Sequence, residues 1–198
     1  MAFVTAADEV QLAYDDQGSG VPLLCLPGLT RNMDDFETVL AHYGDRARVI
    51  RMDFRGRGAS GHADFTTYTP PQEAQDVVTL LDHLGLEKVC VLGTSRGGLV
   101  ALMLAVMAPT RLSGVIFNDV GPEVMAEGLS TIMEYIGRPP TFTSLAEAAA
   151  ALPGVYDGVF RNVPAATWAD FARRVWREED GALHLRYDPR LRDAVAPA

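Results

Sequence analysis

The sequence predicts an α/β fold: a doubly wound, mostly parallel sheet of about six strands with helices on both faces. Two observations carry the prediction. Over residues 1–120, apolar runs typical of strands buried on both faces alternate with segments whose apolar residues recur at helical spacing. Glycine, proline or acidic residues directly follow several of these runs, as expected at the edge of such a sheet where ligands bind.

Strands are expected where short apolar runs are bounded by turn residues. Residues 2–16 indicate a hairpin, because two strand-like runs flank a turn. Residues 21–26 form an uninterrupted apolar run, as in the middle of a parallel sheet. The same reasoning places strands at residues 48–52, 88–92 and 113–118.

Helices are expected between these strands. Helical spacing of apolar residues spans 33–43, a second helix begins at Pro71 and ends near Leu84, and a third covers 96–107. Strands that alternate with helices in this way favour parallel pairing, because each helix carries the chain back across the sheet.

Beyond Val120 the pattern changes to helical pieces. They are expected near residues 122–137, 143–152 and 165–177, with no clear strand before 184–186. Such an insert is expected to form a helical lid over the strand ends. The chain therefore divides into a core over 1–120, a lid over 121–188 and the start of a return to the core over 189–198.

Composition excludes several classes of function. The formal net charge of −9 argues against nucleic-acid binding, which needs a basic face. The chain lacks a long apolar run, so no membrane span is expected, and its first residues do not resemble a signal peptide. Cys25 and Cys90 lie in strand-like runs and are expected to be reduced, buried thiols. We expect a cytoplasmic protein.

The pattern Gly93-x-Ser95-x-Gly97 lies between the strand at 88–92 and the helix at 96–107. In this context it predicts a nucleophile elbow, a tight turn that presents the serine hydroxyl at the edge of the sheet. Glycines on both sides let the strand and helix backbones approach without a Cβ clash. The alternative is a serine that only caps the helix, but an ordinary cap does not need glycines on both sides.

Two further motifs precede the elbow, Leu26-Pro27-Gly28-Leu29 after one strand and Asp53-x-Arg55-Gly56-x-Gly58-x-Ser60 after the next. In this order the three motifs resemble the α/β-hydrolase superfamily, in its lid-bearing serine hydrolase branch of esterases and lactonases. The resemblance covers essentially the whole chain. The glycines of the second motif suit a sharp loop, which Asp53 and Arg55 are expected to hold in place.

The resemblance implies an acyl-enzyme route. Ser95 would be the nucleophile, and the backbone N–H groups of Leu29 and Arg96 would form the oxyanion hole. A serine at this position points to acyl transfer on a small apolar ester or lactone, with no metal or organic cofactor. The Arg96 side chain is open to two interpretations, contact with a substrate anion or a structural role.

The resemblance also implies a triad in the order serine, acid, histidine, with the acid after a seventh strand and the histidine after an eighth. Neither position is found in this sequence. Asp119, after the strand at 113–118, is a candidate acid; a cap at the entry to the lid is the alternative. Of the four histidines, His62 is the first candidate for a substitute base and His184 the second.

Three interpretations of the missing histidine remain open. The chain is the N-terminal portion of a serine hydrolase, a non-catalytic relative that binds a ligand, or a hydrolase completed by another chain. We favour the first, because the strand at 113–118 would otherwise be an apolar edge without the charged residues that usually protect one. Such an edge also predicts self-association.

The expected lid carries apolar side chains that suit a small hydrophobic substrate. Met125, Trp168 and Phe171 are candidate substrate-binding residues. The alternative is that these side chains pack the lid onto itself or onto the core, which is the commoner fate of large apolar residues.

Overall fold

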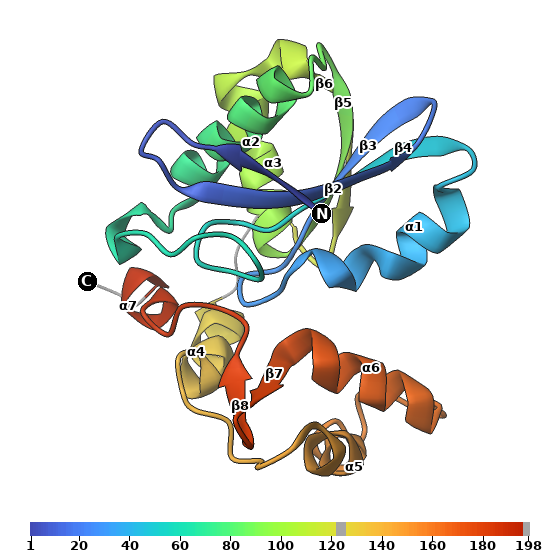
Figure 1. The fold of residues 1–198 in the computed structure, drawn as a ribbon, viewed down its shortest axis with the longest axis vertical. Helices are drawn as coiled ribbons and strands as arrows, with labels where there is room; N and C mark the ends of the chain where they lie inside the picture. Colours follow the sequence, from blue (N-terminus) through green and yellow to red (C-terminus); the bar gives the residue numbers. More distant parts are fainter. Residues whose placement is uncertain (122–125, 196–198) are drawn as a thin grey trace.

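A six-stranded sheet forms the core of the computed structural model, which describes residues 1–121 and 126–195 (Figure 1). The strand order is β1-β2-β4-β3-β5-β6. The strands are β1 (Ala2–Thr5), β2 (Gln11–Gly18), β3 (Val21–Leu26), β4 (Ala47–Met52), β5 (Val89–Thr94) and β6 (Leu112–Asn118). This confirms the predicted α/β class and places every expected strand to within a few residues.

The sheet is parallel except at one side. The β1–β2 and β2–β4 pairs are antiparallel, whereas β4, β3, β5 and β6 run parallel to one another. The carboxyl ends of these four strands therefore lie along one edge. The loops after β3, β4 and β5 carry the three sequence motifs, and Asp119 follows β6.

Helices cover the two faces of the sheet. On one face lie the short 3₁₀ helix Met33–Phe36 and α1 (Glu37–Tyr43); on the other lie α2 (Pro70–His83) and α3 (Arg96–Met107). Thr69 caps α2 by accepting a hydrogen bond from the Gln72 amide, and Pro70 occupies its first turn. The main hydrophobic core lies between α2, α3 and the sheet.

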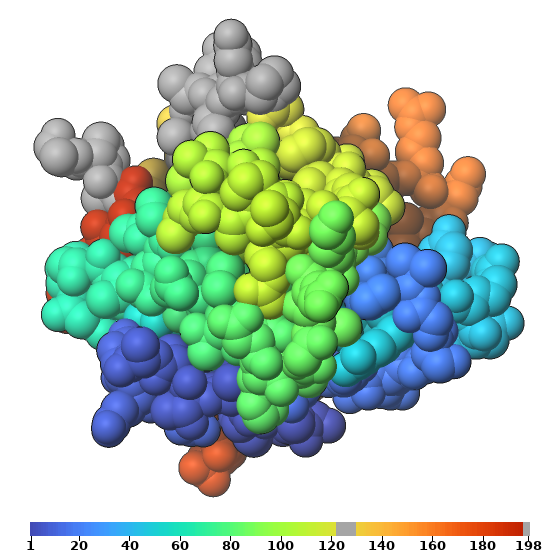
Figure 2. All heavy atoms as spheres, turned by 90° about the horizontal axis from the view of Figure 1, so that it is seen from above, coloured from blue at the N-terminus to red at the C-terminus, as the bar shows by residue number. Residues whose placement is uncertain are grey.

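The α1 face of β5 and β6 stays partly open. Cys90, expected to be buried, is only half-buried, and Ile116 on the neighbouring strand is 50% exposed. Leu92 and Ile116 line a hollow of about 420 Å³ beside Val39 of α1. Among the described residues no strand pairs with the outer edge of β6. Figure 2 shows residues of α3 and β6 (yellow-green) at the molecular surface.

The rest of the described chain, residues 126–195, is here called the C-terminal segment. It contains α4 (Ala126–Tyr135), α5 (Leu145–Val155), α6 (Ala165–Val175), β7 (Trp176–Glu179), β8 (Ala182–Leu185) and α7 (Leu191–Val195). The expected helix over 165–177 is two residues too long, and the strand near 184–186 is half of a hairpin. Asp180 and Gly181 both adopt positive φ, as in the Asp-Gly turns that favour two-residue hairpins.

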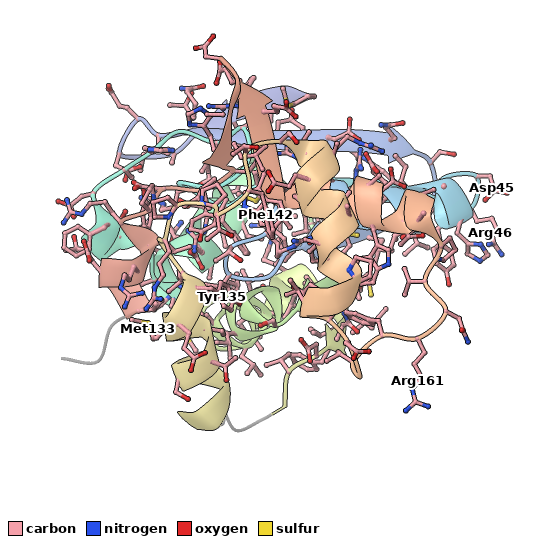
Figure 3. All side chains as sticks on the ribbon, turned by 90° about the horizontal axis from the view of Figure 1, so that it is seen from below. Asp45, Arg46, Met133, Tyr135, Phe142 and Arg161 are labelled. Carbon is pink, nitrogen blue, oxygen red and sulfur yellow. The ribbon has the colours of Figure 1, made fainter. Side chains whose placement is uncertain are left out.

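The C-terminal segment lies against the loops at the carboxyl ends of the strands (Figure 1). Asn32 Nδ2 donates to the Arg174 carbonyl oxygen at 2.7 Å. Near the same end of the β7–β8 hairpin, the Gly58 amide donates to the Arg186 carbonyl oxygen, also at 2.7 Å. Figure 3 views the molecule from this side and shows Tyr135 and Phe142 on this segment. None of the helices in the described part of the chain has the length and apolar character needed to cross a bilayer.

Candidate active site

Ser95 occupies the turn between β5 and α3 in a conformation that few side chains adopt. Its backbone has φ 50° and ψ −110°. The Ser95 amide donates to the Asn118 carbonyl oxygen of β6 at 2.9 Å, and the Ser95 carbonyl oxygen accepts from the Gly98 amide. Strained non-glycine backbone of this kind persists where the surrounding structure holds it, often at active sites. The Ser95 hydroxyl makes no capping bond to α3, which argues against the capping interpretation.

The glycines on both sides of Ser95 are required by close contact. A Cβ on Gly97 would lie 2.1 Å from the carbonyl oxygen of Leu26, and a Cβ on Gly93 would lie 2.5 Å from that of Gly97. Only glycine lets α3 approach β3 and β5 this closely. The spacing of the motif therefore has the physical cause that the sequence indicated.

The two candidate oxyanion donors border this turn. Arg96 is the first residue of α3, where backbone N–H groups have no partner within the helix. Gly28 passes close to the serine, because a Cβ built on it would lie 3.9 Å from the Ser95 Cβ. Leu29 comes next in the chain, and its carbonyl oxygen accepts a hydrogen bond from Arg57 Nε at 3.0 Å. Arg96 thus follows Ser95 directly at the end of β5, and Leu29 follows Gly28 in the loop after β3.

The Arg96 side chain has a structural role. Arg96 Nε donates to Glu73 Oε2 at 2.6 Å, and Arg96 Nη2 donates to the Tyr68 carbonyl oxygen at 2.7 Å. Glu73 also faces Arg57, whose Nη2 lies 2.9 Å from Glu73 Oε1. The two groups therefore form a buried ion pair. Burial lowers the pKa of the fully buried Arg57 guanidinium, and the Glu73 carboxylate opposes that shift.

The sequence analysis did not single out Glu73. The carboxylate is completely buried, and it lies on the helical face that α2 turns to the core. A signal was present, since Glu73 precedes Val77, Leu80 and Leu84 of the apolar stripe by four, seven and eleven residues. A charged residue at such a position is rarely left without a buried partner.

Tyr68 links the same network to the C-terminal segment. Its hydroxyl donates to Asp188 Oδ2 at 2.7 Å, and the Asp188 amide donates to the Gly56 carbonyl oxygen. Burial raises the pKa of the Tyr68 hydroxyl to about 12, so the hydroxyl remains a donor at neutral pH. The network therefore runs from the elbow to the point where the C-terminal segment returns to the core.

Asp53 holds its loop in place, as expected. Its Oδ1 accepts from the Met33 amide at 2.6 Å and its Oδ2 accepts from the Ala59 amide at 2.8 Å. Burial raises the pKa of the Asp53 carboxyl to about 6, although the two amide donors partly offset that shift. Arg55 is tied down separately, by a two-pronged ion pair with buried Asp76.

Asp119 directly follows β6 and is exposed, with φ 54°. The preceding residue, Asn118, contacts the elbow, because its carbonyl oxygen accepts a hydrogen bond from the Ser95 amide. In the described part of the chain no histidine contact to Asp119 is recorded. Its role as the acid stays a prediction.

The two candidate bases, His62 and His184, line a cleft that does not include Ser95. His62 Nδ1 is 3.6 Å from Asp188 Oδ2, and the side chain is 65% exposed. His62 and His184 line one cleft of about 680 Å³, between the loop after β4 and the β7–β8 hairpin. Ser95, Leu29 and Arg96 are not among the described residues that line it. The structure thus places both histidines in one cleft, which Ser95 does not line. Within the described residues no cluster of histidine, cysteine and carboxylate side chains forms a metal site.

The three candidate substrate-binding residues have different surroundings. Trp168 is buried and stacks on Tyr156, with ring centroids 5.9 Å apart. Phe171 contacts the same cluster and lies under the Arg31 guanidinium, 4.7 Å from the ring centroid. Met125 lies outside the described residues. Trp168 packs α5 against α6, the alternative that the sequence left open, and Phe171 faces the core loops.

The comparisons with known proteins agree with this geometry. A family model described as alpha/beta hydrolase fold matches residues 21–190. A 3-hydroxybutyrate-oligomer hydrolase from Cupriavidus necator is 33% identical over 189 residues, which are 91% of this chain and 64% of that protein. A 3-oxoadipate enol-lactonase 2 from Acinetobacter baylyi is 30% identical over 146 residues, 73% of this chain and 54% of that protein.

A solved structure is similar over nearly the whole chain. The crystal structure of an alpha/beta hydrolase from Novosphingobium aromaticivorans matches with a TM-score of 0.89 at 37% identity. The match covers 96% of this chain and 68% of that one. The chain spans less than two thirds of the length of the two curated relatives.

Proposed function

Because the chain belongs to the alpha/beta hydrolase fold family, we propose that it is a serine hydrolase in which Ser95 forms an acyl-enzyme. The observation that carries the proposal is the conformation of Ser95. Its backbone is held at φ 50° between β5 and α3, and its hydroxyl makes no capping hydrogen bond to α3. The glycines on both sides of Ser95 are packed against backbone, where a larger residue would clash, as a nucleophile elbow requires.

In the proposed reaction the Ser95 hydroxyl oxygen attacks the carbonyl carbon of an ester, and a base takes the hydroxyl proton. The negative charge that develops on the carbonyl oxygen is stabilised by the N–H groups of Leu29 and Arg96. The alcohol leaves with a proton from the protonated base. Water then attacks the acyl-enzyme by the same route and releases the acid, which regenerates Ser95.

The proposed substrate is a small apolar ester or lactone, and the C-terminal segment is proposed to act as a lid. The names of the relatives support both halves of this class, since one is a hydrolase of 3-hydroxybutyrate oligomers and another an enol-lactonase. Phe171 and the segment's contacts with the loop at Asn32 support a lid over the strand ends. Hydrolysis of p-nitrophenyl butyrate, a 3-hydroxybutyrate dimer and a γ-lactone tests the two subclasses against each other.

Labelling with a fluorophosphonate tests the nucleophile. We expect the 198-residue protein to be labelled at Ser95 and the Ser95→Ala variant to lose the label. Ser113→Ala is the matched control, because Ser113 is an exposed serine at the opposite end of β6. Equal labelling of wild type and Ser95→Ala would contradict the proposal, because the probe would then react at another residue. No labelling at all would show that neither His62 nor His184 activates Ser95 in this chain.

The base is tested with the same probe. His62→Ala and His184→Ala each remove one candidate from the shared cleft, and Asp119→Asn removes the candidate acid. A loss of labelling rate of about 100-fold in one histidine variant identifies that residue as the base. If both histidine variants retain the wild-type rate, neither His62 nor His184 is the base in this chain.

A further inference from the structure

We propose that Glu73 is a positioning residue for the oxyanion hole, which fixes its two backbone donors relative to each other through Arg57 and Arg96. This inference rests on the proposed function, because it concerns the same site. Glu73 itself is fully buried in α2, and its contacts are with the side chains of Arg96 and Arg57.

One carboxylate joins the two sides of the site. Its Oε2 holds Arg96 Nε at 2.6 Å, and Arg96 supplies the N–H at the start of α3. Its Oε1 lies 2.9 Å from Arg57 Nη2, and Arg57 Nε holds the Leu29 carbonyl oxygen at 3.0 Å. The two donors come from the loops after β5 and β3, two strands that pair directly in the sheet.

The rigidity of the two guanidiniums makes this link effective. A guanidinium is planar and always charged, so its donors keep fixed directions once the group is packed. Both arginine side chains are buried, and each also donates to a further backbone carbonyl, Arg57 to Arg55 and Arg96 to Tyr68. A shift of either guanidinium is therefore transmitted to backbone rather than absorbed by a flexible side chain.

The charge of Glu73 is needed as well as its shape. The cluster holds two guanidiniums and one carboxylate, so a neutral residue at position 73 leaves two buried cations facing each other. Glutamine fills the same volume and keeps one acceptor, but it no longer offsets that repulsion. We expect the Arg57 side chain to move away from Arg96 and to draw the Leu29 carbonyl with it.

The experiment compares Glu73→Gln with Asp76→Asn and Arg57→Lys. Asp76 is the matched control: it is another buried carboxylate of α2, but it pairs with Arg55. The first readout needs no activity. In the ¹⁵N spectrum of the 198-residue chain, Glu73→Gln should shift the amides of both Leu29 and Arg96 and speed their hydrogen exchange. Asp76→Asn should leave both amides unchanged. Arg57→Lys, which loses the directed bond to Leu29, should affect mainly the Leu29 amide.

The second readout uses hydrolysis of p-nitrophenyl butyrate. We expect Glu73→Gln to lower kcat by about 10- to 100-fold with KM within twofold, because a misplaced donor affects the transition state and not ground-state binding. Active-site titration with the fluorophosphonate corrects for unfolded protein. Asp76→Asn should keep the wild-type kcat per titrated site.

The outcomes separate the two proposals. If Ser95→Ala retains activity or labelling, the proposed function fails, and the amide shifts still test the link between the two loops. If Ser95 is required but Glu73→Gln keeps its kcat, or if its amide pattern equals that of Asp76→Asn, Glu73 has no positioning role. If Glu73→Gln does not fold, Arg57→Lys decides: an unchanged Leu29 amide and kcat overturn the inference.

Discussion

Substitution of Gly97 by alanine should damage the protein more than its single methyl group suggests. The new Cβ would lie 2.1 Å from the Leu26 carbonyl oxygen and 2.6 Å from the Leu26 carbonyl carbon. Real Cβ atoms essentially never come closer than 3.0 Å to such atoms, so α3 must move away from β3 by about 0.9 Å, the difference between 3.0 and 2.1 Å. The atoms on both sides are backbone, which cannot rotate out of the way.

The expected loss in the free energy of unfolding is about 3 kcal/mol, at the upper end of the range for overpacked sites. Chemical denaturation in urea, with the slope held common to all variants, measures it. Gly154→Ala is the control, because Gly154 lies in α5 with open space around the position of a Cβ. That variant should gain about 0.5–1 kcal/mol from its higher helix propensity.

The same change should also impair chemistry. A retreat of α3 carries the Arg96 N–H away from Leu29, so labelling of folded protein by the fluorophosphonate should slow by at least about 10-fold. If Gly97→Ala has the stability of Gly154→Ala and an unchanged labelling rate, the close approach of α3 to β3 does not exist in the protein, and the reasoning about the elbow is refuted.

Two further predictions follow. The pKa of Asp53 rises from 3.8 in the unfolded chain to about 6 in the folded one, so folding is favoured by a bound proton and the wild type loses stability as pH rises from 4 to 7. Relative to Asp53→Asn, that loss should be about 2 kcal/mol between pH 4 and 7; parallel stability curves would contradict it. The exposed edge of β6 should mediate self-association. Ile116→Lys should therefore lower the molecular mass measured by sedimentation at high protein concentration, whereas Val106→Lys on α3 should leave that mass unchanged. A wild-type protein that stays monomeric would refute the idea.

The order of elements was predictable because burial leaves a periodic record in the chain. Residues 21–26 are apolar at every position, since both faces of β3 are covered, and the structure has this strand at Val21–Leu26. The hairpin of β7 and β8 was missed because its strands are polar and short, and only the Asp180-Gly181 turn marks it. A two-residue turn indicates a hairpin less strongly than a periodic pattern of apolar residues over about ten positions indicates a helix or strand.

Ser95 and its glycines were identified from sequence because an elbow needs a local pattern, five residues whose spacing follows from one turn. The partners of that turn are not local. Glu73, Arg57 and Arg96 are separated in the chain, and only the packing of α2 against α3 and the loop after β4 brings their charges within 3 Å. The same holds for His62 and His184, which share a cleft that Ser95 does not line. The sequence therefore determined the family and the candidate nucleophile, through short-range sterics and periodic burial. The three-dimensional packing decided what surrounds the proposed oxyanion donors and where the histidines lie, because contacts between distant segments leave no regular spacing in the sequence.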